Sequence, residues 1–296
     1  MEEIKKVGVV APTESRVRFF LRLMRKNKES VIGASIVAIF IVTALVVEVA
    51  QLLRVQLTPY NPITQNVGPV LSPPSWGHLF GTDVLGRDVF SRIIASTPND
   101  VAVGLEVVVV ALLLGTFIGA VAAFRGGIID EALMRFTDII FALPALVIAM
   151  VIAVALGPGL QNMMIAMTII WWPPYARVAR GEALKIRHQN YIEAARLSGM
   201  STWKTIVKHV IPNFFTIMMI YGTLDIGTVI LTYAGLSYLG LSVRPPTPDW
   251  GEMISEFQDY LITAPWLPLI PGVVIALEVV GFSLLGDGLR DALEAQ

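Results

Sequence analysis

Five acidic side chains lie in or near long apolar stretches of this 296-residue sequence, a setting in which ionisable groups usually serve a function. They are Glu48, Glu106, Asp138, Asp225 and Glu278. A charge at the centre of a bilayer costs about 2.5–3.5 kcal/mol on the insertion scale, so such groups should face a bundle interior or a watery cavity. There a carboxylate can line a translocation path and meet a polar or cationic substrate, or it can hydrogen-bond to a neighbouring helix. We weigh both roles equally for Asp225, favour hydrogen bonding for Glu278, and take Asp225 and Glu106 as candidates for the path.

Nucleotide and metal chemistry have no such candidates in the sequence. A P-loop has the pattern G-x-x-x-x-G-K-[ST], because backbone amides cradle the phosphates and the lysine reaches the terminal groups. Gly81 and Gly86 have the glycine spacing, but Arg87 and Asp88 follow them, and the sequence contains no Gly-Lys pair. The three histidines are far apart without an HExxH motif, and there are no cysteines. We therefore expect no ATP hydrolysis, no catalytic residue, no cofactor and no metal site in this chain.

The composition indicates a protein that lies in a membrane. Hydrophobic residues make up 55% and charged residues only 15%, against about 25% charged residues in soluble domains. The net charge of −1 gives no general attraction to nucleic acid. Six segments are candidate spans: 31–53, 101–124, 133–156, 160–172, 214–241 and 266–286. The fourth can continue into the polar stretch that follows it.

Each of these segments is predicted to be a helix, because a helix satisfies its own backbone hydrogen bonds in lipid. The apolar runs do not alternate as the strands of a membrane barrel do. The sequence therefore predicts an all-α, polytopic membrane protein with six transmembrane helices. Pro144 predicts a kink in the third segment. Gly115 and Gly119 form a GxxxG motif, which permits either packing within the bundle, the commoner role, or a specific dimer contact.

The distribution of positive charge predicts the topology. If both ends are cytoplasmic, eighteen of the 22 Lys and Arg residues lie inside and four outside, as the positive-inside rule requires. Residues 1–29 then form a cytoplasmic basic tail, and the first span after it is an anchor rather than a cleaved signal. Residues 30–98 hold this span and an extracytoplasmic, proline-rich loop, which we expect to be extended with one helical piece after Gly86. The core domain is 99–288, and 289–296 is a cytoplasmic C-terminus.

Residues 190–212 interrupt the apolar pattern with a charged, amphipathic stretch on the predicted cytoplasmic side. Asn190 and Glu193 have the spacing of a capping box, Gly199 suits the left-handed position that ends a helix, and Ser201 suits a second N-cap. Five apolar residues then follow helical spacing: Trp203, Ile206, Val207, Val210 and Ile211. The pattern predicts a helix, a tight turn and a short amphipathic helix up to Pro212. It fits an interfacial linker or a docking element for a cytoplasmic partner equally well.

A family resemblance favours the docking element. Glu193-Ala194-Ala195, then Gly199, then Ile211-Pro212 resembles the EAA loop of ABC importer permeases. GTDVLGRDV at 81–89, GLSYLGLSVRPPTPDWG at 235–251, TAPW at 263–266 and LLGDGLRDAL at 284–293 resemble segments of the dipeptide/oligopeptide/nickel subfamily. These motifs occur in the subfamily's order from about residue 15 onward. The chain is identified as similar to its second, C-type permease subunit.

The resemblance implies a type I ABC importer transmembrane domain in the cell membrane. It implies four further partners, which are a second homologous permease, two ATPases that bind ATP and Mg, and an extracytoplasmic binding protein. It implies that one run of residues couples the chain to the ATPases: Glu193, Ala194, Ala195, Arg196, Leu197, Ser198, Gly199, Met200 and Ser201. Peptides are the expected substrate, with oligosaccharides or nickel as alternatives, since Glu106 and Glu278 stand where apolar residues are common in the family.

Two functions from other classes stay open on the residues alone. A proton-coupled secondary transporter would use Asp225 as a proton relay and would need no ATPase. A membrane scaffold would not transport at all.

Overall fold

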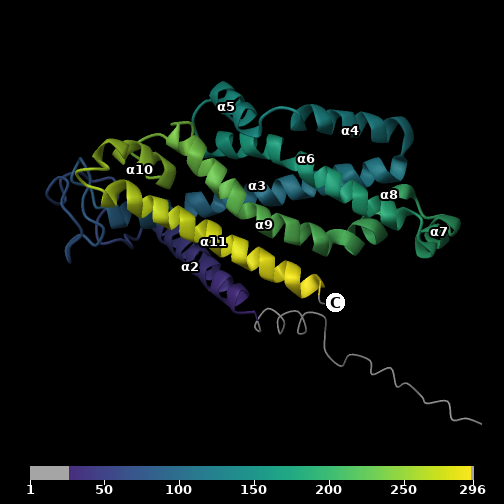
Figure 1. The fold of residues 1–296 in the computed structure, drawn as a ribbon, viewed down its shortest axis with the longest axis horizontal. Helices are drawn as coiled ribbons and strands as arrows, with labels where there is room; N and C mark the ends of the chain where they lie inside the picture. Colours follow the sequence, from purple (N-terminus) through teal and green to yellow (C-terminus); the bar gives the residue numbers. More distant parts are fainter. Residues whose placement is uncertain (1–26, 295–296) are drawn as a thin grey trace, which may run out of the picture.

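The computed structural model describes residues 27–294, and this part of the chain is helical, with an isolated bridge between Thr82 and Asp88 as its only β-pairing (Figure 1). The helices in chain order are α2 (Lys28–Leu52), α3 (Val89–Arg125), α4 (Gly127–Phe141), α5 (Ala145–Leu156), α6 (Leu160–Arg187), α7 (Asn190–Leu197), α8 (Thr202–Thr205), η1 (Ile206–Val210), α9 (Ile211–Tyr238), α10 (Trp250–Phe257), η2 (Gln258–Tyr260) and α11 (Trp266–Glu294). The predicted all-α class is confirmed. The predicted basic tail falls almost entirely outside the described residues.

The predicted spans correspond to helices of this bundle. Within the described residues, four helical runs are long and apolar enough to cross a membrane: Lys28–Leu52, Val89–Arg125, Thr202–Tyr238 and Trp266–Ala292. The pair α4 and α5 makes a fifth candidate span. The fourth predicted segment is the start of α6, a helix of 28 residues. This helix continues through the polar stretch and ends at Arg187. The second half of α6 is polar, which lowers the mean hydropathy of this helix.

Pro144 breaks the third segment instead of only bending it. It is the N-cap of α5, and α4 and α5 meet at 88°. Proline lacks an N–H and disfavours helix in the residue before it, which favours the end of α4 before Pro144 and a new helix after it.

The helical piece predicted after Gly86 is present, but it is the first part of α3 rather than a separate helix of the loop. The Asp88 side chain accepts a hydrogen bond from the Ser91 backbone N–H at 2.8 Å, and α3 runs from Val89 to Arg125 with Pro98 inside it. Ser91, Arg92 and Ile93 are buried in the first turns. Packing of this stretch therefore offsets the one backbone hydrogen bond that Pro98 cannot make.

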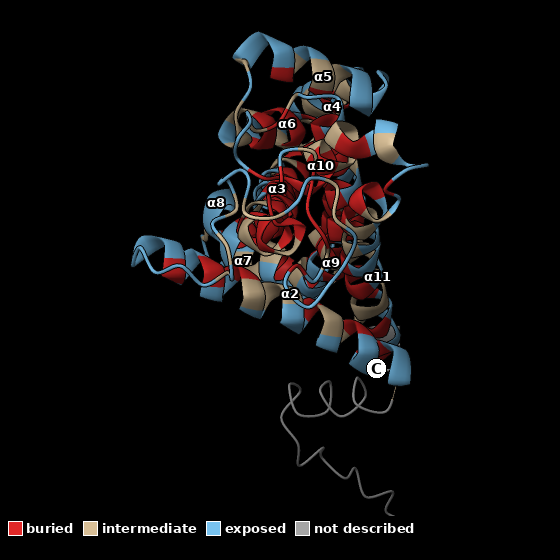
Figure 2. Cartoon of the chain, turned by 90° about the vertical axis from the view of Figure 1, so that its left-hand side faces the viewer, coloured by how far each residue is buried: buried red, intermediate tan, exposed pale blue. Residues whose placement is uncertain are grey.

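Helix α3 lies in the middle of the bundle, against α6, α9 and α2, and α11 packs on α2 and α9 (Figures 1 and 2). Gly115 and Gly119 face α6 so closely that an added Cβ would lie 2.5 Å from the Trp172 carbonyl oxygen and 2.2 Å from that of Ala176. The GxxxG motif therefore packs two helices of one chain, which is the bundle role that the sequence favoured over a dimer contact.

Candidate functional site

The segment 190–201 projects from one end of the bundle, with α7 at its tip (Figure 1). Ile192 is buried, but Glu193, Ala194 and Arg196 are exposed, and Leu197 is 90% exposed. An apolar side chain this accessible beside a free carboxylate and a guanidinium forms a mixed surface of the kind that proteins present to partners.

The predicted capping box at the start of α7 is wrong. The helix begins one residue earlier than that pattern requires, with Gln189 as its N-cap, and no side chain caps it. Asn190 is therefore the first helical residue, where its side chain cannot bond the amides of the first turn. The Glu193 side chain has no hydrogen bond or ion pair within residues 27–294, so it does not cap its own helix. It lies in the first turn, where the helix dipole favours a negative charge.

The turn after α7 has the geometry that its glycine predicted. Gly199 has φ +82°, and an added Cβ would meet no atom within 4 Å. The Met200 amide donates to the Ala195 carbonyl at 3.1 Å, and the Gly199 amide to that of Arg196 at 3.0 Å. These two bonds form a Schellman motif, in which the left-handed residue is usually glycine. Only the backbone conformation requires glycine here, because there is room for a side chain.

The helix after the turn is not a separate short helix. Ser201 caps α8, as predicted, and its hydroxyl accepts from the Lys204 amide at 3.4 Å. However, α8 continues through the π-helical turn η1 into α9, which makes one 37-residue run, Thr202–Tyr238. Pro212 has no N–H that could donate to the carbonyl four residues before it. The wider π turn accommodates this missing hydrogen bond. Within the turn, the Ile211 amide donates to the Ile206 carbonyl.

Only one side of the predicted apolar stripe is buried. Ile206 and Val210 are buried, whereas Trp203 is 53% exposed and Val207 is 45% exposed. The Trp203 ring packs edge-on against Phe117 of α3, with 5.3 Å between ring centroids. One edge of the stripe thus belongs to the core and the other is accessible.

Two contacts that the sequence did not reveal hold α7 to the bundle. The Asn213 side-chain amide donates to the Tyr191 hydroxyl at 3.0 Å, and the Arg196 guanidinium lies over the Phe124 ring, 5.1 Å from its centroid. Together with buried Ile192, these contacts connect α7 to the start of α9 and the end of α3. Both pair residues distant in sequence, so no local spacing indicates them.

Of the two path candidates, Asp225 is the one whose carboxylate accepts hydrogen bonds within residues 27–294. Its Oδ2 accepts from Trp171 Nε1 at 2.5 Å and from the Tyr175 hydroxyl at 2.8 Å, so it links α9 to α6. The side chain is half-buried. Hydrogen bonding between helices, one of its two predicted roles, is therefore present.

Glu278 does not make the interhelical hydrogen bond expected of it. The residue is fully buried in α11, and neither carboxylate oxygen has a hydrogen-bond partner within residues 27–294. The ionisable group that interacts with it electrostatically is Asp100, another buried acid. The packing places no donor of α2 or α9 within reach, which residue spacing alone could not indicate.

Glu106 lies apart from Asp225, on the exposed side of α3. Together with Glu48 of α2 and Gln161 of α6 it lines a hollow of about 430 Å³, and Asp225 is not among the lining residues. The two path candidates are thus not brought together in one site by this chain.

A polar cluster joins the segment 81–89 and the start of α3 to α10, the helix that follows the segment 235–251. Arg87 Nε donates to Asp83 Oδ2 at 2.5 Å, and Arg87 also binds Glu256 of α10. Arg92 Nη2 donates to Glu256 Oε2 at 3.0 Å and lies 3.5 Å from Glu252. Burial and the neighbouring Glu256 raise the pKa of the Glu252 carboxyl to about 7, although Arg92 and Arg87 oppose the shift. The cluster borders a hollow of about 540 Å³.

Asp249 anchors α10 to the rest of the bundle. Its carboxylate accepts from the amides of Gly251 and Glu252 at 2.9 and 3.1 Å, and from the Tyr233 hydroxyl of α9 at 2.5 Å. The next residue, Trp250, donates from Nε1 to the Ile93 carbonyl of α3 at 3.2 Å. The end of the motif at 235–251 therefore connects α10 to α9 and α3.

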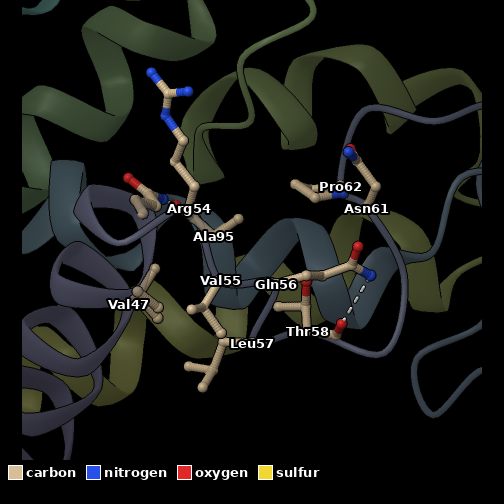
Figure 3. Close-up of a pocket in the computed structure, with 11 residues that line it drawn as sticks. Val47, Arg54, Val55, Gln56, Leu57, Thr58, Asn61, Pro62 and Ala95 are labelled. Atoms are coloured by element: carbon tan, nitrogen blue, oxygen red, sulfur yellow. Dashed lines mark hydrogen bonds between the residues drawn. The ribbon is translucent and has the colours of Figure 1, made fainter.

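A third hollow, of about 320 Å³, lies at the end of α2 (Figure 3). Its lining is mainly apolar and amide side chains, and Arg54 extends away from Leu57 there. A hydrogen bond from Gln56 Nε2 to the Thr58 carbonyl, at 3.2 Å, closes the turn beside it. No acid or histidine lines this hollow, so it offers no acid–base chemistry. Within residues 27–294, no group of three or more His, Cys, Asp or Glu side chains could hold a metal ion.

Comparison with known proteins gives consistent similarities. Residues 111–296 match the family model described as "Binding-protein-dependent transport system inner membrane component". The chain is 38% identical over 271 residues to the dipeptide transport system permease protein DppC of Alkalihalophilus pseudofirmus, covering 92% of this chain and 87% of that protein. It is 36% identical over 293 residues to the oligopeptide transport system permease protein OppC of Bacillus subtilis, covering 99% and 92%. It is 39% identical over 244 residues to the di/tripeptide transport system permease protein DppC of Pseudomonas aeruginosa, covering 80% of each chain.

Proposed function

This chain belongs to the family of binding-protein-dependent transport system inner membrane components, and we propose that it is the membrane-spanning permease subunit of an ATP-driven importer of dipeptides and oligopeptides. The names of three similar permeases, two for dipeptides or tripeptides and one for oligopeptides, support the substrate class. The observation that carries the coupling role is the exposed, rigidly held α7 with its Schellman turn.

The chain works with four partners in this proposal. A second homologous permease completes the translocation path, an extracytoplasmic binding protein delivers the peptide, and two cytoplasmic ATPases bind ATP and Mg. This chain itself binds no cofactor and hydrolyses nothing. Both termini are cytoplasmic, an orientation supported by the charge distribution, since seven of the 22 Lys and Arg residues fall between 175 and 212.

Residues Glu193 to Ser201 are the coupling surface of the proposal. Glu193 has no hydrogen bond or ion pair to any residue between 27 and 294, and Leu197 offers an apolar contact, so an ATPase groove can bind both. The 37-residue run that begins at Thr202 extends from this surface past Asp225 as one stiff element. When ATP closes the ATPase pair, α7 moves with it, the permeases rotate as rigid bodies, and the path opens outward. Hydrolysis returns it inward.

Asp225 and Glu106 are the proposed acidic groups of the path. Asp225 is half-buried with two donors on one oxygen, so its carboxylate has capacity for a further donor such as the ammonium of a peptide. Its position on α9, the helix that α7 moves, would couple exposure of this group to the nucleotide state.

The coupling role is tested by the double variant Glu193→Ala/Gly199→Leu in vesicles that hold the complete complex. We expect membrane insertion to persist and peptide uptake to fall to background while ATP hydrolysis continues. The matched control is Glu131→Ala, since Glu131 is also an exposed acid but lies on α4, with its side chain 70% exposed. Unchanged uptake in the double variant would contradict the proposal.

A proton-coupled transporter makes a different prediction. Vesicles that hold this chain alone, with a proton gradient and no ATPase, should show no peptide uptake. Uptake under those conditions would reject the ATP-driven assignment. Titration of the binding protein with peptides and with oligosaccharides tests the substrate class, and we expect binding of the peptides.

A further inference from the structure

One side of α9 is polar and accessible around Asp225. Steps of three or four residues along a helix return to the same side, and such steps connect Asp225 to four other residues. Together they are Tyr221, Asp225, Thr228, Thr232 and Gly235. None of the five is buried, and Tyr221 is 49% exposed. The other side of this stretch is buried in the bundle, with Ile226, Val229, Ile230 and Tyr233. We call the five accessible residues the polar stripe.

The polar stripe has hydrogen-bonding capacity that the described chain does not use. Within residues 27–294, the hydroxyls of Tyr221 and Thr228 have no hydrogen-bond partner. The Thr232 hydroxyl donates to the Thr228 carbonyl at 2.8 Å, so its oxygen can still accept a hydrogen bond. Beside Gly235 the space is open, because an added Cβ would meet no atom within 4 Å. A molecule that lies along the stripe can therefore both donate and accept hydrogen bonds.

Asp225 supplies the charge of the polar stripe, and its two donors fix how the carboxylate lies. Trp171 Nε1 and the Tyr175 hydroxyl both bind Oδ2, at 2.5 and 2.8 Å, which leaves Oδ1 without a donor within residues 27–294. Both donors are neutral, and no Lys, Arg or His in this range forms an ion pair with Asp225. An ionisable group in a membrane span usually pairs with a partner group, and Asp225 lies in the span Thr202–Tyr238. Its carboxylate therefore has room for a cation from another molecule.

We propose that the polar stripe binds a short peptide in extended form, with the peptide's α-ammonium group on Asp225 Oδ1 and its backbone along Thr228 and Thr232. Trp171 and Tyr175 act as positioning residues, because they hold Oδ2 and so direct Oδ1 towards the ammonium group. The proposal rests on the proposed function, which makes a peptide the transported molecule. It adds the orientation of that peptide and the residues that its backbone contacts.

The length of the stripe fits a peptide of two or three residues. Asp225 and Thr232 are seven residues apart, which is about 10 Å along a helix at roughly 1.5 Å per residue. An extended peptide advances about 3.3–3.6 Å per residue, so about three residues cover this distance. The unbonded hydroxyl of Thr228 and the accepting oxygen of Thr232 match the carbonyl and amide groups of a peptide backbone.

Other neighbours suit the stripe less well. Lipid tails form no hydrogen bonds, so lipid would leave the free oxygen of Asp225 and the hydroxyls of Tyr221 and Thr228 unsatisfied. A helix of the second permease uses its backbone groups within itself, and only its side chains could reach the stripe. An extended peptide presents free backbone groups at every residue and carries a cation at one end, which is the combination that the stripe lacks.

Cysteine labelling in the complete complex tests the proposal, since the sequence contains no cysteine. Thr228→Cys is reacted with a water-soluble maleimide while a non-hydrolysable ATP analogue holds the complex open to the outside. We expect labelling at position 228, and trialanine in excess over the binding protein should slow it. N-acetyl-trialanine should need a roughly tenfold or higher concentration for the same protection, because it lacks the charge-assisted hydrogen bond to Asp225.

The matched control is Thr216→Cys, because Thr216 is an exposed residue of the same type on the opposite side of α9. Neither peptide should change its labelling. Asp225→Asn in the Thr228→Cys background should abolish the preference for the free amino terminus, which also separates this preference from one of the binding protein. Tyr175→Phe and Trp171→Phe keep aromatic rings but remove the donors, and each should reduce the preference. A merely structural role would change stability without changing the ratio between the two peptides.

Three outcomes would overturn the proposal. The maleimide could fail to reach position 228, as it would if lipid or a helix of the second permease covered the stripe. The two peptides could protect position 228 equally. Asp225→Asn could keep the wild-type preference. If Asp225→Asn does not assemble, the comparison of the two peptides and the Tyr175→Phe variant decide the question.

A failure of the proposed function would look different. A wild-type complex without ATP-dependent peptide uptake would show that the importer assignment is wrong. Normal uptake without a preference for the free amino terminus at position 228 would reject only the role of the polar stripe.

Discussion

At the residue scale, surroundings give the same acidic group different roles in this chain. Asp225 accepts two hydrogen bonds, Glu278 is buried with no hydrogen bond in the described structure, and Glu106 is exposed beside the hollow that it lines with Glu48. Glu252 shares a half-buried cluster with two arginines. The sequence places all four in helices, but only packing determines which donors each can meet.

The raised pKa of Glu252 predicts a pH dependence of stability. The folded chain holds this proton until about pH 7, while the ordinary value is 4.5, so unfolding releases a proton between these values. The stabilising effect is complete below about pH 4.5 and is lost as the pH rises towards 7. Glu252→Gln should remove this dependence and raise the stability at pH 8 by on the order of 2–3 kcal/mol.

Thermal unfolding of the detergent-solubilised complex at pH 5 and pH 8 measures this effect. Glu131→Gln is the control, since its side chain is 70% exposed and should leave the pH dependence as in wild type. A Glu252→Gln protein with the wild-type pH profile would contradict the account.

At the element scale, proline and glycine decide where the helices end, bend and touch. Pro144 separates α4 from α5, Pro212 accompanies the π turn before α9, and Gly199 ends α7 in the left-handed region. Gly119 acts differently, because it allows contact between the backbones of α3 and α6. The geometry of the bundle therefore depends on the backbone properties of its prolines and glycines.

The contact between α3 and α6 predicts that Gly119→Val is strongly destabilising. A Cβ there would meet the Ala176 carbonyl oxygen at 2.2 Å and the Arg180 amide nitrogen at 2.7 Å, so the two helices must separate. We expect a loss of about 1–3 kcal/mol or more, measured as the unfolding midpoint in detergent.

Gly235→Ala in α9 is the matched control, because its Cβ would meet nothing within 4 Å. It should be neutral or stabilise the helix by roughly 0.5–1 kcal/mol. Equal midpoints for Gly119→Val and wild type would show that the helices do not depend on this approach.

At the scale of the whole molecule, ion pairs connect segments that are far apart in the sequence. Arg92 at the start of α3 binds Glu256 of α10, 164 residues later, and Arg87 binds the same carboxylate. The cluster fixes the loop before α3 against the segment before α11. It thereby orients the end of the bundle opposite to α7 (Figure 1).

Removal of Arg92 should therefore affect the whole bundle. Its side chain is 1% exposed, so Arg92→Met leaves Glu252 without its buried cation and Glu256 with Arg87 alone, and it should cost about 3–5 kcal/mol. The double variant Arg92→Met/Glu256→Gln should recover part of this loss, as the carboxylate that Arg92 bound is also removed. A double-mutant cycle on unfolding midpoints measures the coupling, and strict additivity would exclude it.

The sequence was sufficient for features that depend on local chemistry. Apolar runs of helical length predicted the spans, because a membrane accepts few other structures. Gly199 predicted the turn after α7, since few residues other than glycine adopt its backbone conformation readily. Ser201 predicted the cap of α8, and its short side chain acts within three residues of its own position.

The tertiary structure decided features that depend on which residues of neighbouring helices face each other. The capping box at Asn190 was wrong because the helix begins one residue earlier. Of the predicted stripe, Ile206 and Val210 are buried in the bundle, whereas Trp203 and Val207 stay about half exposed. The donors of Asp225 lie on α6, far from it in sequence, and the neighbours of buried Glu278 include no donor to its carboxylate in the described residues. Spacing along one helix sets which face a residue lies on, but only packing of the helices sets which group that face meets.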